Sequence, residues 1–101
     1  MVLYVVNTTI KKHLQGEWLK WMKETHIPNV IATGYLTKAE IYTVILPQKG
    51  GDEITFSVQY YSDSYEKFMA YSVKESKRLQ KEHTDKFGDY ISEERFVFEK
   101  S

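Results

Sequence analysis

The sequence predicts an α+β fold whose elements follow the order β-α-β-β-α-β. Two apolar stripes with helical spacing, one ending near Pro28 and one near Gly88, predict two helical regions. The segments around them are rich in Val, Ile, Thr and Tyr, which are typical of strands. The clearest of these segments, Glu53 to Tyr61, alternates apolar and polar residues, as a strand does when only one face lies in the core.

The length and composition limit the class of protein. A chain of 101 residues has the size of one domain, so we expect residues 1–101 to form a single unit. Its net charge of zero argues against a nucleic-acid partner, because phosphates are neutralised by a surplus of Lys and Arg. No apolar run approaches the roughly 20 residues that span a bilayer, so no membrane partner is expected. The absence of cysteine excludes disulfides and thiolate metal sites and fits a cytoplasmic protein.

The first strand is expected over Met1 to Asn7, whose apolar residues fall on both faces, as in a central strand. Asn7, Thr8 or Thr9 can then cap the first helix, which we expect from Ile10 to Thr25. The apolar stripe of this helix consists of Leu14, Trp18, Trp21 and Met22.

Pro28 is expected to interrupt this helix, because a proline disfavours helical geometry at the residue before it. The first helix should therefore end near His26, with a bend at that point. A proline suits the first turn of a helix, so a short second helix is expected over residues 28–33. Gly34 should end it in the left-handed conformation.

The second half of the chain starts with a strand expected over Tyr35 to Leu46. The segment PQKGGD at residues 47–52 is a turn signal that leads into the next strand. Asp63 and Glu66 have the spacing of a capping box and predict the start of the second long helix, with Gly88 as its end. The stripe of this helix comprises Tyr65, Phe68, Met69, Ser72, Leu79, His83 and Phe87.

A last strand, expected over Tyr90 to Lys100, completes the ferredoxin-like order of elements. Right-handed connections place the first and third strands side by side and parallel at the centre, and we expect a four-stranded antiparallel sheet with the helices on one face. The other face of the sheet carries too much apolar surface to remain exposed to solvent. A second copy of the chain is the simplest partner that would bury it. We therefore expect a homodimer in the form of a dimeric α+β barrel.

Three segments carry a family resemblance: EWLKWMKETHIPNVIATG at residues 17–34, SVQYY at residues 57–61, and EH at residues 82–83 with FGD shortly after. They resemble a small bacterial family named only as domain of unknown function 4286, over essentially the whole chain. That family is placed among the dimeric α+β barrels of ferredoxin-like topology, which include cofactor-free monooxygenases, muconolactone-isomerase-like enzymes and haem-degrading proteins. The His-Ile-Pro segment that starts at His26 is also similar to ethyl-tert-butyl-ether-degradation-type domains. The resemblance implies the fold and the dimer, but one fold hosts many functions.

His26 is the candidate catalytic residue. The dipole at a helix C-terminus favours a protonated histidine, and a histidine titrates in the range that suits proton transfer. His26 is thus a candidate general acid or base at the mouth of an interior cavity. The alternative is a helix cap that hydrogen bonds to free carbonyl groups.

The other two histidines are weaker candidates. His83 is a candidate for substrate binding, but its place on the apolar stripe, four residues from Leu79 and Phe87, is more often that of a core residue. His13 is expected to be exposed. The three histidines lack the close spacing of a metal site, so neither a metal nor another cofactor is expected.

Four further candidates for substrate binding are Trp21, Gln59, Tyr61 and Arg95. Gln59 and Tyr61 share the polar face of their strand and would line a pocket in the barrel, or else form hydrogen bonds at the dimer interface. Arg95 can hold a carboxylate with its fork of donors, or pair with Glu53, Glu93 or Glu99. Trp21 suits an aromatic pocket wall, although at helical spacing it is more often a core residue.

Two functions stay open at this point, and the sequence does not decide whether the protein is an enzyme. In the first, the dimer binds or converts a small molecule, without a cofactor, in a barrel-interior pocket near His26, which requires a cavity of about 300 Å³ or more. In the second, the protein is a non-enzymatic dimerisation or interaction module with a filled interior.

Overall fold

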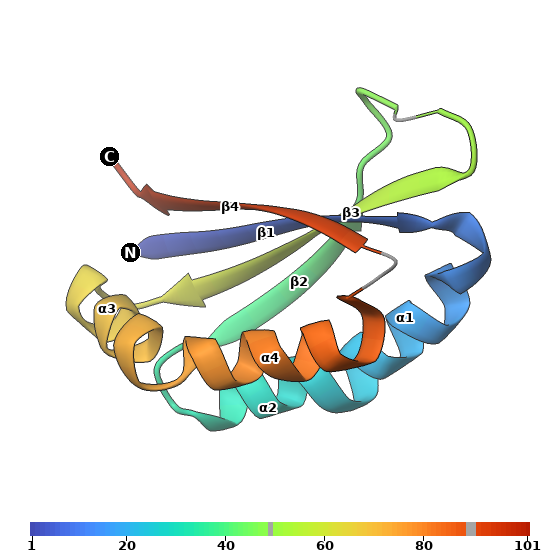
Figure 1. Cartoon of the computed structure of the whole chain (residues 1–101). Coiled ribbons are helices and arrows are strands. Elements are labelled where there is room, and N and C mark those ends of the chain that lie inside the picture. The colour runs from blue at the N-terminus through green and yellow to red at the C-terminus, as the bar shows by residue number, and fades with distance from the viewer. Residues whose placement is uncertain (49, 89–90) are drawn as a thin grey trace.

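The computed structural model describes residues 1–48, 50–88 and 91–101. Its strands are β1 (Val2–Lys11), β2 (Lys38–Thr43), β3 (Glu53–Ser62) and β4 (Ile91–Glu99). They form a four-stranded antiparallel sheet in the order β2-β3-β1-β4. The helices cover one face of this sheet, and the loop between β2 and β3 rises on the other side (Figure 1). The predicted ferredoxin-like fold is confirmed.

The direction of the central strands differs from the prediction. β1 and β3 are neighbours at the centre, as expected, but they are antiparallel, with Val6 opposite Val58. The reason lies in the connections: each helical crossover joins two parallel strands that are two positions apart in the sheet. The strand between such a pair runs opposite to both, so the expected parallel pairing of β1 and β3 is wrong.

β1 is longer than predicted and includes Thr8 and Thr9, which therefore do not cap a helix. Both are β-branched, which favours extended backbone. Thr8 is buried in the core, and the Thr9 hydroxyl lies 2.7 Å from the hydroxyl of Thr55 on β3. The chain enters the helical segment through a 3₁₀ turn, η1 (Lys12–Leu14), and not at Ile10.

The first helical segment continues through the predicted break. It consists of α1 (Gln15–Trp21), a π-helical turn, η2 (Met22–His26), and α2 (Ile27–Ala32). His26 keeps helical dihedral angles, with φ −69° and ψ −52°. In the π turn the N–H of Ile27 donates to the carbonyl of Met22, five residues back. This wider turn lets the chain pass Pro28, which has no N–H to donate, without ending the helix. Gly34 has the predicted left-handed backbone, with φ +84°.

The later elements differ from the prediction at their ends. β2 is shorter than expected at both ends: it starts at Lys38, and the chain leaves the sheet after Val44, whose N–H still donates to the carbonyl of Thr55. The second long helix is two helices, α3 (Tyr65–Lys74) and α4 (Ser76–Phe87), broken at Glu75, where φ is −126°. Ser64, not Asp63, caps α3, because its side chain accepts a hydrogen bond from the N–H of Lys67. The expected start of β4 at Tyr90 lies outside the described residues.

The core lies between the sheet and the helices. It includes Tyr4, Val6, Phe56, Val58 and Tyr60 from the sheet and Trp18, Met22, Tyr71, Leu79 and Phe87 from the helices. Tyr65 and Met69, which were expected in the helical stripe, are exposed, and Tyr71 is buried in their place, because the break at Glu75 turns α3 relative to α4. Within the described part of the chain, no helix is long and apolar enough to cross a membrane.

The other face of the sheet, which we call the open face, carries no helix in the part of the chain that the structure describes. The registers place on it alternate residues of each strand, among them Leu3, Val5 and Asn7 of β1, Ser57, Gln59 and Tyr61 of β3, and Glu94, Phe96 and Phe98 of β4. This is the alternation that the sequence of β3 predicts.

Candidate functional site

A group of polar side chains interrupts the apolar core beneath the helices. We call it the histidine cluster; it consists of Trp21, His26, Glu82, His83, Glu93 and Arg95. The two histidines are 8% and 4% exposed. Burial of ionisable groups is costly unless each finds a partner, and such groups gather at functional sites more often than elsewhere. The cluster is therefore the candidate site.

The hydrogen bonds of His83 fix its protonation. Its Nε2 lies 2.9 Å from the indole Nε1 of Trp18. An indole N–H only donates, so this nitrogen of His83 accepts and carries no proton. The proton of the neutral ring is then on Nδ1, which lies 3.4 Å from the carboxylate of Glu93. His83 thus links the helices to β4 and has no nitrogen left for a ligand.

His26 is held differently. Its Nδ1 lies 3.2 Å from Oε1 of Glu82, and the amide of Asn29 also donates to Glu82 at 3.3 Å. A carboxylate accepts, so Nδ1 carries the proton and Nε2 is the basic nitrogen. Burial lowers the pKa of His26 below its ordinary value, while the hydrogen bond to Glu82 opposes this shift. His26 is therefore a neutral base near pH 7, oriented by a carboxylate.

Trp21 joins the two histidines. Its ring stacks on His26 with centroids 5.1 Å apart and on His83 with centroids 5.7 Å apart. This stacking fixes the planes of both imidazoles, in addition to the hydrogen bonds at their edges.

Glu93 and Arg95 close the cluster on the side of β4. The Arg95 guanidinium donates to Glu93 at 3.1 Å. Burial alone would raise the pKa of the Glu93 carboxyl, but the hydrogen bond from His83 and the charge of Arg95 outweigh it, so the pKa is lowered. Burial also raises the pKa of the neighbouring Tyr4 phenol, although Arg95 acts against this. At neutral pH the mouth of the cluster holds an ionised Glu93, a cationic Arg95 and an un-ionised Tyr4.

A small cavity lies within the cluster. Its volume is about 30 Å³, and its polar lining comes from Tyr4, Gln80 and Arg95 together with His26, His83 and Glu93. This is enough for about one water molecule and far below the several hundred Å³ of a typical ligand pocket.

The structure separates the predicted site residues into two groups. Trp21, His26, His83 and Arg95 share the histidine cluster, and Arg95 makes the ion pair with Glu93 that was one of its alternatives. Gln59 and Tyr61 lie on the open face, where Gln59 donates to Ser57 at 3.2 Å and Tyr61 donates to Glu40 at 2.9 Å. His26 is thus between helix and sheet, on the other side of the sheet from Gln59 and Tyr61, and it does not cap a helix.

Sequence reasoning missed Glu82 and Trp18 as members or partners of the site, and it named Glu93 only as a possible partner of Arg95. Glu82 and Glu93 each reach a histidine on a separate element, and the Glu82–His26 contact joins residues 56 positions apart. A usable signal existed for Glu93: it shares one parity of β4 with Ile91 and Val97, so a carboxylate faces the core side of a strand.

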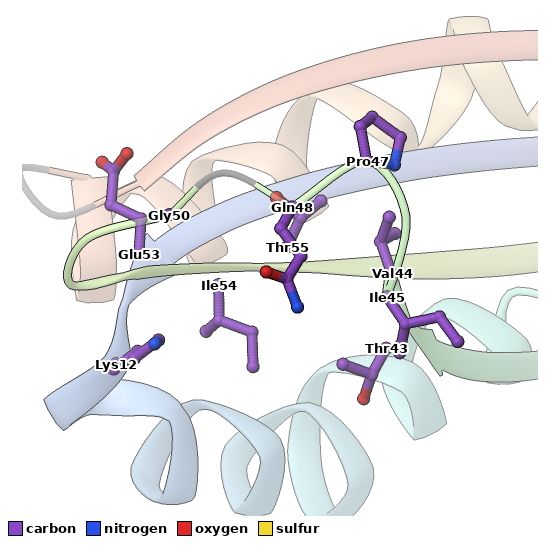
Figure 2. Close-up of a pocket in the computed structure, with 10 residues that line it drawn as sticks. All are labelled: Lys12, Thr43, Val44, Ile45, Pro47, Gln48, Gly50, Glu53, Ile54 and Thr55. Carbon is purple, nitrogen blue, oxygen red and sulfur yellow. The ribbon is translucent and has the colours of Figure 1, made fainter.

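Larger hollows occur near the β2–β3 loop. One of about 210 Å³ lies under the loop, with Ile45 and Pro47 on one side and Lys12 and Glu53 toward the other end (Figure 2). A second, of about 290 Å³, lies on the open face against Asn7, Thr9 and Ser92. Neither contains a histidine, and in the described ranges no group of three or more His, Cys, Asp or Glu residues is arranged to hold a metal ion.

Comparison with known proteins identifies the class. The chain matches, over residues 1–101, the family described as Domain of unknown function (DUF4286), and it belongs to that family. The resemblance in the sequence is thereby confirmed. No curated protein matches the chain.

Several solved structures share the fold. HapK from Hahella chejuensis is 9% identical with a TM-score of 0.72, over 100% of this chain and 93% of HapK. An ethyl tert-butyl ether d (EthD) family protein from Bacillus halodurans is 15% identical with a TM-score of 0.65, over 100% of both chains. A dimeric ferredoxin-like protein from an uncultured marine organism is 15% identical with a TM-score of 0.64, over 100% of this chain and 97% of its own. At these identities the likeness extends to the fold and not to the chemistry.

Proposed function

We propose that the protein binds a small molecule at the histidine cluster, without a cofactor, and that His26 accepts a proton from it. The observation that carries this proposal is the Glu82–His26 pair, which places the proton on Nδ1 and leaves Nε2 as the base. His26 also lines the small cavity, together with Arg95 and Glu93. A carboxylate behind a histidine is a common arrangement for a general base.

The size of the cavity decides what can enter it. About 30 Å³ admits the reacting end of a ligand and not a whole substrate. Gln80 and Arg95 line the same cavity and are exposed, so their side chains can rotate outward and enlarge it. Glu93 keeps its contact with His83 when Arg95 moves, which limits the cost of opening. The ligand we expect is small, with a weakly acidic group for His26 and an acceptor group for Arg95.

A thermal-shift screen of small metabolites tests this proposal with a matched pair of variants. His26→Gln removes the base, and His13→Gln removes an exposed histidine that lies outside the cluster. We expect a ligand that raises the melting temperature of the wild type and of His13→Gln but not of His26→Gln. A ligand at a hundred times its Kd stabilises the fold by about 2.7 kcal/mol, which such a screen detects. Ligands that stabilise all three proteins equally would contradict the role of His26.

The second candidate function is a non-enzymatic dimerisation or interaction module. The near-complete filling of the core favours it, because the cavity is about a tenth of the volume that a substrate needs. In that case the histidine cluster is a buried network that fixes how the helices pack on the sheet. It predicts that no metabolite shifts the melting temperature, whereas His26→Gln still lowers it in the free protein.

For either function we propose that the chain forms a homodimer through the open face. Phe96 and Phe98, 41% and 52% exposed, lie there with their rings stacked. The dimeric ferredoxin-like protein from an uncultured marine organism, which shares the fold, also supports a dimer. Gln59 and Tyr61 would then lie between the two sheets. Analytical sedimentation at micromolar concentration should show a dimer. A monomer would contradict the proposed homodimer. The cytoplasmic location stays a prediction of the sequence.

A further inference from the structure

We propose that the two copies of the homodimer are related by a two-fold axis that crosses the strands, so that the β2–β3 loop of each copy packs on an apolar strip of the other. The inference rests on the homodimer proposed above. It adds which surface of one copy meets which surface of its partner.

The first of the two surfaces is the β2–β3 loop. Its residues Val44, Ile45, Leu46 and Pro47 are consecutive and apolar, and Ile45 and Leu46 are 73% and 81% exposed. The loop rises on the side of the sheet opposite the helices (Figure 1). Neighbouring aliphatic side chains that are this exposed to solvent suggest that this part of the loop contacts another surface.

The second surface is the apolar strip, which consists of Leu3, Val5, Phe96 and Phe98. The register pairs Leu3 with Phe98 and Val5 with Phe96, so the four side chains are neighbours on the open face, where the two phenylalanines are exposed, Leu3 is half-buried and Val5 is buried. The Phe96 and Phe98 rings are stacked, with centroids 6.0 Å apart.

The two surfaces lie at opposite ends of the same face. Val44 and Pro47 of the loop line a hollow with Asn7, Thr9 and Ser92, toward the end of β1. The strip lies at the start of β1, about 20 Å from Thr9 at the usual rise per residue. An axis across the strands exchanges these ends, so each loop meets the partner's strip and the contact is formed twice. An axis along the strands would instead bring the two raised loops against each other.

The area of the open face is similar to the area that each partner buries in a stable dimer. Ten residues of β1 and four strands give a face of roughly 33 by 19 Å from the usual strand spacings. That is close to the roughly 800 Å² per partner of an ordinary specific interface once the relief of the side chains and the loop is added.

Single cysteines test the arrangement, because the natural sequence contains none. Leu46→Cys and Phe98→Cys replace exposed side chains, so the fold should tolerate both. The two purified variants are mixed, allowed to exchange subunits and treated with a short bismaleimide. We expect cross-linked dimers between Leu46→Cys and Phe98→Cys chains, and at least tenfold less product from Leu46→Cys alone. In the control, Phe98→Cys is mixed with Lys23→Cys in place of Leu46→Cys. Lys23 lies on the exposed side of the helical segment, so this mixture should give no cross-link between the two variants.

The outcomes separate the two proposals. A dimer in which Leu46→Cys cross-links to itself more efficiently than to Phe98→Cys overturns the axis proposed here and leaves the homodimer intact. A dimer without cross-links at either position also overturns it. A monomer in sedimentation overturns the homodimer itself, together with this inference.

Discussion

The indole N–H of Trp18 can only donate, and it lies 2.9 Å from Nε2 of His83. A side chain buried at 0% exposure thereby sets the tautomer of a histidine 65 residues later in the chain. The same logic applies to His26, whose proton is placed by the Glu82 carboxylate. The chemistry of the histidine cluster is therefore set by its donors and acceptors, residue by residue.

Trp18→Phe removes this donor and keeps most of the aromatic volume. We expect it to cost about 1–3 kcal/mol of unfolding free energy, because His83 Nε2 is left buried without a donor. Trp18→Ala, which also opens a cavity, should cost about 3–5 kcal/mol. Urea unfolding measures both, with Trp21→Phe as the control, since its indole contributes stacking to the cluster. A Trp18→Phe loss no larger than that of Trp21→Phe would show that the hydrogen bond is unimportant.

The lowered pKa of His26 predicts a dependence of stability on pH. Its pKa in the fold lies below the 6.5 of an unfolded chain, so on acidification the unfolded state takes up the proton first. The stability that His26 contributes is complete above pH 6.5 and is lost as the pH falls toward the folded pKa. Between pH 7.5 and 5.5 the wild type should lose more unfolding free energy than His26→Gln. Parallel losses in the two proteins would argue that the pKa of His26 is not lowered.

At the scale of the elements, local rules predict the backbone conformation of Gly34 correctly but wrongly predict that the first helix ends before Pro28. Gly34 ends α2 with positive φ, as expected. Pro28 does not end the helix, because a π turn absorbs it and the packing of Trp18, Met22 and Val30 holds both halves against the sheet. The energy of this packing exceeds the local preference of the residue before a proline.

Two glycines of this segment should respond to alanine in opposite ways. Gly34→Ala forces a side chain into a backbone with φ +84° and should cost about 1 kcal/mol. Gly16→Ala lies in α1, meets no atom within 4 Å and should stabilise the fold by about 0.5–1 kcal/mol. Thermal and urea unfolding of the two variants compare the signs. A stabilising Gly34→Ala would contradict the left-handed backbone at that position.

At the scale of the whole molecule, the sheet separates the histidine cluster, which lies beneath the helices, from the open face. The alternation in β3 predicts this division, and it places Gln59 and Tyr61 on the face away from the core. The histidine cluster itself could be predicted only in part. The sequence indicates His26, and it suggests His83 and Arg95, with Glu93 among the possible partners of Arg95, but no local pattern tells which carboxylates the two histidines meet. Glu82 and Glu93 reach them through tertiary packing, which brings α4 and β4 beside the π turn.

The most direct test of the account is the protonation of the imidazole nitrogens, measured by long-range ¹H–¹⁵N NMR at pH 7.5. We predict that His26 is neutral, with its proton on Nδ1 and an unprotonated Nε2, and that His83 shows the same tautomer. His13, which is exposed, provides the reference signals. A proton on Nε2 of His26, or an imidazolium ring, would contradict the tautomer that the Glu82 carboxylate favours and with it the proposed role of His26 as a base.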